Sequence, residues 1–102
     1  MLIHEVLSPE AEHRLSRLAD SAQTARVVAH HSTPEGAGGV FARVQPRLAV
    51  YTHIVPSPAG EADLVPATRK VYRGRLAVGY DLMLVTIGSD VTVGRRETRP
   101  DR

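Results

Sequence analysis

The sequence contains no cysteine, which excludes disulfide bonds and every metal site built from thiolates. No apolar run approaches the roughly 20 residues that a helix needs to cross a bilayer. The N-terminal segment carries Glu5, Glu10 and Glu12 and has no basic-then-apolar signal pattern. We therefore expect a cytoplasmic protein that has no membrane partner.

Two common catalytic and nucleotide-binding motifs are also absent. The chain has no G-x-S-x-G pattern, and Ser32 directly follows His31, so a Ser-His-acid triad is not expected. The phosphate-binding loop G-x-x-x-x-G-K-[ST] is missing as well. Hydrolysis through a serine nucleophile and nucleotide binding through a P-loop are thus excluded as leading hypotheses.

The chain has little excess charge of either sign. The 13 Lys and Arg residues face 11 Asp and Glu residues, and a net charge of +2 makes no basic stripe for nucleic acid. Five arginines lie near or in the C-terminal tail, and they leave nucleic-acid binding an open question: Arg73, Arg75, Arg95, Arg96 and Arg99. The 102 residues, 42% of them hydrophobic, suit one domain or part of one.

Strand and helix patterns alternate along the chain. The expected strands cover residues 1–7, 27–29, 48–55, 76–80, 82–87 and 91–93. Two helices are expected after Ser8 and Thr33, each with a proline at its first position, and a third covers 63–72. This order predicts an α/β fold with a mostly parallel sheet over residues 1–93, followed by a polar tail over residues 94–102.

Three of the expected strand ends carry polar, titratable residues: His4-Glu5, His30-His31-Ser32-Thr33 and Thr52-His53. In α/β sheets functional groups collect where strands end, so these residues could meet at one edge. A lone histidine at such a place is more often structural than a ligand, and Thr33 caps a helix whatever His31 does. Glu5 is the unusual residue, because a buried carboxylate needs a partner. A histidine at a neighbouring strand end would serve.

At these strand ends the chain resembles the metallo-β-lactamase superfamily, and within it the ribonuclease Z-like branch. The matches to its HEAT-type, HST-type, T-H-[IF] and final G-x-D-[LG]-M motifs are Leu2–Glu5, His31–Glu35, Tyr51–Ile54 and Gly79–Met83. The likeness spans about residues 2–93. Val6-Leu7 stands where Ala-Thr is usual, so another phosphodiesterase or ester hydrolase is as much expected as a tRNA-processing enzyme.

The resemblance implies a fold and a set of roles. The fold would be the C-terminal half of an αββα sandwich: a mixed sheet with three helices and a terminal β-hairpin. His53 matches a ligand of one of two zinc ions, and His31 matches the histidine that donates a proton to the leaving oxygen. Glu5 matches the acidic residue that orients this histidine. Ser32 and Thr33 would shape the loop that faces the substrate.

The remaining family ligands are missing: the H-x-H-x-D-H motif, a further histidine and a bridging aspartate. We therefore expect an incomplete metal-dependent hydrolase of phosphodiesters or other esters. It would need an N-terminal half for activity, and it would not hold zinc stably by itself. The alternative is a non-catalytic binding or assembly module that dimerises through the open face of its sheet.

Overall fold

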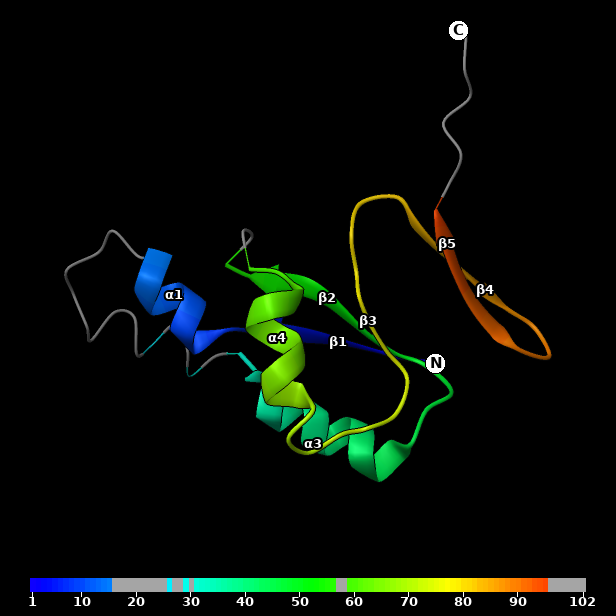
Figure 1. Cartoon of the computed structure of the whole chain (residues 1–102), viewed down its shortest axis with the longest axis horizontal. Coiled ribbons are helices and arrows are strands. Elements are labelled where there is room, and N and C mark those ends of the chain that lie inside the picture. Colours follow the sequence, from blue (N-terminus) through cyan, green and yellow to red (C-terminus); the bar gives the residue numbers. More distant parts are fainter. Residues whose placement is uncertain (16–25, 27–28, 30, 57–58, 96–102) are drawn as a thin grey trace, which may run out of the picture.

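The structure is a computed structural model that describes residues 1–15, 26, 29, 31–56 and 59–95 (Figure 1). Its elements, in chain order, are β1 (Leu2–Leu7), α1 (Pro9–Leu15), α3 (Pro34–Val44), β2 (Ala49–Val55), α4 (Glu61–Thr68), β3 (Leu76–Val78), β4 (Met83–Ile87) and β5 (Val91–Arg95). The predicted α/β class is confirmed in this described part. None of its helices combines the length and the apolar character that crossing a membrane requires.

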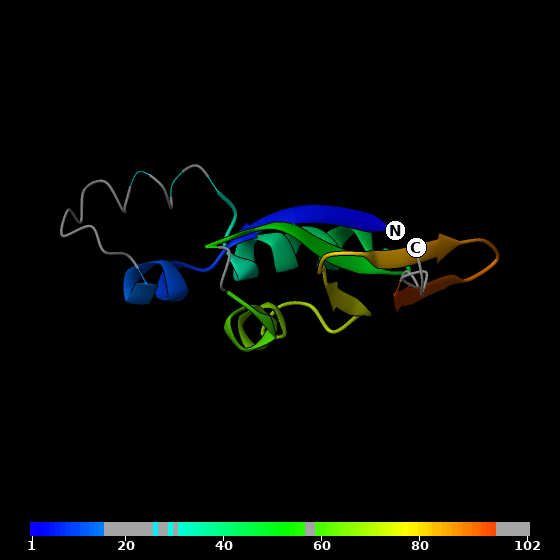
Figure 2. The same cartoon turned by 90° about the horizontal axis from the view of Figure 1, so that it is seen from above.

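The strands form two sheets. β1, β2 and β3 are parallel and lie in that order, whereas β4 and β5 form an antiparallel hairpin with a sheet of its own. The resemblance implies a mixed sheet with a terminal hairpin; parallel and antiparallel pairing and the hairpin are all present, but they are divided between two sheets. Figures 1 and 2 show α1 and the hairpin at opposite ends of the molecule. β5 runs to Arg95, past the predicted end of the strand, and residues 96–102 lie outside the described part. The strand predicted at 27–29 also lies outside it, except for Ala29, whose backbone is helical.

The N-terminal caps of two helices are formed as the sequence predicts. The Ser8 hydroxyl accepts the backbone N–H of Ala11 at 3.2 Å, and the Thr33 hydroxyl accepts that of Gly36 at 3.1 Å. Each cap satisfies one of the backbone donors that the first turn of a helix leaves unpaired. Both helices therefore start at the proline that follows the cap.

The third predicted helix, 63–72, is displaced and too long. α4 begins at Glu61 because the Asp63 carboxylate accepts the backbone N–H of Gly60 at 3.0 Å, which closes the first turn earlier. Pro66 consequently lies in the second turn rather than the first. The residues after α4 form turns.

One face of the parallel sheet is covered by α3 and α4. Its core consists of Val6, Ala37, Phe41, Ala49, Tyr51, Leu64 and Tyr72. The Tyr51 hydroxyl lies 2.6 Å from the Thr68 hydroxyl and 3.2 Å from the carbonyl oxygen of Pro34, so it ties β2 to both helices. Burial raises the pKa of Tyr51, which therefore stays neutral in this core.

The buried stripe of α3 differs from the predicted one. The helical spacing of Ala37, Val40, Phe41 and Val44 predicts one buried stripe. Ala37 and Phe41 are buried, but Val40 and Val44 are 38% and 56% exposed. The helix instead turns Gly38 toward the end of α4, where a Cβ would lie 2.7 Å from a methyl carbon of Val71. Gly38 thus lies at a close contact between α3 and the end of α4.

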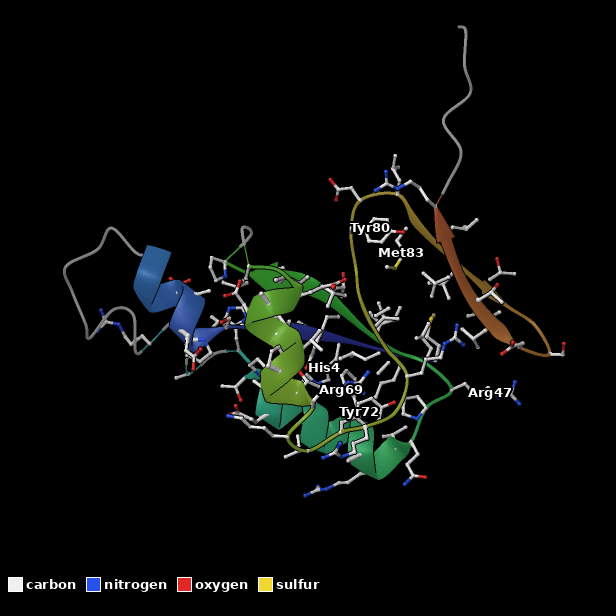
Figure 3. The ribbon with its side chains drawn as sticks, viewed as in Figure 1. His4, Arg47, Arg69, Tyr72, Tyr80 and Met83 are labelled. Carbon is white, nitrogen blue, oxygen red and sulfur yellow. The ribbon has the colours of Figure 1, made fainter. Side chains whose placement is uncertain are left out.

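The opposite face of the sheet is covered in part by the hairpin. Leu48 and Val50 pack with Val91 in a second, smaller apolar cluster. Two arginines hold the hairpin in place: Arg47 (labelled in Figure 3) donates to the carbonyl oxygen of Ser89 at 3.1 Å, and Arg75 donates to that of Val91. Among the described residues of this face, Ile3 stays 54% exposed.

Candidate functional site

The carboxyl-terminal ends of β1 and β2 bring two of the three predicted strand ends together. Glu5 of β1 pairs with Thr52 of β2 in the parallel register. The segment before α3 joins the same edge, because the N–H of Leu7 donates to the carbonyl oxygen of Ser32 at 2.8 Å. Glu5, His31 and His53, which come from three separate parts of the sequence, therefore lie at one edge of the sheet.

Glu5 has the partners that its place in an apolar strand requires. One carboxylate oxygen lies 3.1 Å from Nδ1 of His31, and the other accepts the backbone N–H of Ser32 at 2.8 Å. Partial burial raises the pKa of Glu5, but the bonds from Ser32 and His31 outweigh it and hold this pKa below its ordinary value. Glu5 is thus a carboxylate at neutral pH and orients the imidazole of His31.

His53 reaches this pair through an irregularity in β2. The register passes from Glu5 opposite Thr52 to Val6 opposite Ile54, so that His53 is an extra residue bulged out of the ladder. Its φ of 43° lies in the left-handed region, which non-glycine residues seldom adopt. The imidazole is directed toward His31, with ring centroids 5.8 Å apart. Bulges next to active sites commonly re-aim a side chain in this way.

Not all of the predicted strand-end residues belong to this site. His4 packs edge-on against Phe41, at 6.1 Å between ring centroids, in contact with the helix-covered core. The Thr33 hydroxyl is occupied as the cap of α3. Ser32 holds Glu5 through its backbone N–H, which is a structural contact. His30 lies outside the described residues.

An open groove of about 720 Å³ adjoins His53, and Thr52, Tyr80, Asp81 and Met83 are among the residues that line it. Tyr80, on the segment before β4, lies close to Met83, the first residue of that strand (Figure 3). This segment approaches β2 so closely that a Cβ on Gly79 would lie 2.5 Å from the carbonyl oxygen of Tyr51. The Gly79–Met83 motif therefore forms a wall beside the site. Sequence reasoning identified the motif without assigning Tyr80 or Asp81 to a groove.

The arginines that left nucleic-acid binding open are partly engaged inside the chain. Arg75 holds the hairpin, and the guanidinium of Arg95 lies 5.1 Å from the centre of the Tyr80 ring. These contacts give the two residues structural roles.

The donor set of the site suits one metal ion. Glu5, His31 and His53 each offer a ligand atom, and these atoms lie within 4.8 Å of one another. Two zinc ions with a bridging group need more ligands than these three supply. No protein-family model and no curated protein matches the chain. Its function must accordingly be argued from this geometry.

Proposed function

We propose that the chain supplies one edge of the active site of a metallo-β-lactamase-type hydrolase, similar to the ribonuclease Z-like branch, that cleaves phosphodiesters or other esters. His53 is a ligand of one of two zinc ions, His31 is the proton donor, and Glu5 orients His31. The H-x-H-x-D-H motif and the bridging aspartate come from an N-terminal half, without which the chain is inactive.

The contact between Glu5 and His31 is the observation that supports this proposal most. A carboxylate that accepts the Nδ1 proton fixes the tautomer and leaves Nε2 to serve the reacting group. A general acid has to be held within hydrogen-bond reach of the leaving oxygen, and His31 lies beside His53, the ligand of the metal. Ser32 fixes the other oxygen of Glu5, so the carboxylate cannot rotate away.

The experiment joins the chain at Met1 to the N-terminal half of a ribonuclease Z-like enzyme that carries H-x-H-x-D-H. We expect zinc-dependent hydrolysis of bis(p-nitrophenyl) phosphate. His53→Ala removes a ligand and should abolish both metal uptake and activity. His31→Ala should lower kcat by roughly 10²–10⁴-fold while zinc content stays unchanged. The opposite pattern, with metal lost from the His31 variant and kept by the His53 variant, would contradict these assignments.

The second candidate, a non-catalytic module that dimerises, is favoured by one observation. Ile3 of β1 is 54% exposed on the sheet face that the helices do not cover. On this alternative the chain is a dimer whether or not zinc is present, and Ile3→Lys makes it monomeric. Light scattering coupled to size-exclusion chromatography distinguishes the two candidates, because the hydrolase proposal predicts no such zinc-independent dimer.

A further inference from the structure

We propose that Glu5, His31 and His53 form a site for a single divalent metal ion that the chain binds by itself. The hydrolase proposal assigns only His53 to a metal and describes the complete enzyme, and binding by this chain alone departs from the expectation drawn from the family resemblance. The inference made here does not depend on that proposal, because it uses only residues within this chain.

The three donors have the chemistry and the spacing that such a site needs. Two imidazoles and one carboxylate are ligands that zinc and its neighbours in the first transition row accept. Two donors that share one tetrahedral zinc ion lie about 3.4 Å apart, since each bond is about 2.1 Å long. The ligand atoms lie within 4.8 Å of one another. Closing around an ion therefore asks for a movement of up to about 1.4 Å.

His53 is the residue free to make this movement. Glu5 and His31 are already 3.1 Å apart and half-buried, and an ion placed between them would replace the proton that they share. His53 is exposed and bulges out of the ladder, so its ring can approach without disturbing the core. A left-handed, non-glycine residue beside a carboxylate–histidine pair is the kind of strain that marks functional sites.

Three protein ligands leave one coordination position of a tetrahedral ion open. Of the three donors, His53 also lines the groove, together with Thr52 and Asp81. A water molecule or a small anionic ligand would complete the shell from that side. Such an arrangement is that of an accessible site rather than of a closed structural one.

The test titrates the untagged, metal-free chain with ZnCl₂ in a calorimeter and with CoCl₂ in an absorption spectrometer. We expect one ion per chain and the visible absorption bands of four-coordinate Co²⁺. His31→Ala and His53→Ala should each weaken binding at least about tenfold, since even a residue that merely orients a ligand is worth 10–100-fold. His4→Ala, which removes a described histidine that packs on Phe41 and is not one of the three donors, should leave the affinity unchanged.

Two outcomes would overturn the inference. One is that the parent chain binds neither ion. The other is that His31→Ala binds as tightly as the parent, which would leave His31 with the role of a proton donor. Neither outcome touches the hydrolase proposal, which requires no binding by the chain alone and no metal ligand at His31. Glu5→Gln is a poorer metal-binding test, because Glu5 also holds Ser32 and its loss can unfold the 31–33 segment. His53 is exposed, so His53→Ala should leave the fold intact and keeps the test decisive.

Discussion

Replacing His53 by glycine and by alanine separates the contribution of its backbone from that of its imidazole. Both variants lack the ring, and they differ only in a Cβ. With φ at 43°, the Cβ should destabilise the folded state by roughly 1–2 kcal/mol. The greater freedom of glycine in the unfolded chain offsets about 0.5–1 kcal/mol of this. His53→Gly should therefore be more stable than His53→Ala by about 0.5–1 kcal/mol.

Urea unfolding followed by circular dichroism measures this difference, with an expected midpoint shift of about 0.5 M for a chain of this size. The neighbouring Thr52 provides the control pair, because it lies in the regular ladder opposite Glu5. There the order should be reversed, with alanine more stable than glycine by about 0.5–1 kcal/mol. If the two positions behave alike, the backbone at His53 is extended. The reasoning that aims its ring at His31 would then be wrong.

Three further predictions concern the fold that carries the site. Gly39→Ala should be more stable than Gly38→Ala by about 1–3 kcal/mol in urea unfolding, since both gain helix propensity but only the Cβ at Gly38 meets α4. Tyr51→Phe should cost about 1–3 kcal/mol in the same assay, because the buried hydroxyl bonds both helices. Folding lowers the pKa of Glu5, so the ionised carboxylate stabilises the folded, metal-free chain. This stabilisation should be complete above the ordinary pKa of 4.5 and should be lost as the pH falls through the pKa of the folded state. Glu5→Gln should flatten that loss on the acid side of 4.5 in acid titrations; an unchanged pH profile would count against a lowered pKa.

Local signals predicted most of the fold. Ser8-Pro9 and Thr33-Pro34 start two helices where expected, since a capping hydroxyl and a proline act within one turn and need no distant partner. The apolar run over residues 48–52 predicts a strand buried on both faces; residues 48–51 are buried, but Thr52 is exposed. The predicted burial of Val40 failed because the face that α3 buries is set by its contact with α4, through Gly38. A hydrophobic pattern in one helix does not contain that information.

The candidate site was predictable as a set of residues but not as a geometry. Glu5 stood out as a carboxylate in an apolar strand, and His31 was expected at a neighbouring strand end; the structure brings the two together. His4 has the same local setting as Glu5 but lies on the other face, because side chains alternate along β1. The capping role of Thr33 was predictable from Thr33-Pro34, because a cap needs no distant partner.

The bulge at His53 changes which residues of β2 face the helix-covered core. Tyr51 faces the helix-covered core, so a regular strand would bury His53 on that side and turn Ile54 outward. The extra residue reverses the phase: Ile54 packs against the core, and the register continues with Val6 opposite Ile54. In the pairing of β1 and β2, then, His53 has no partner residue. Without His53, β1 and β2 would pair as a regular ladder. The left-handed backbone at this position is explained by the direction that it gives the imidazole, toward Glu5 and His31.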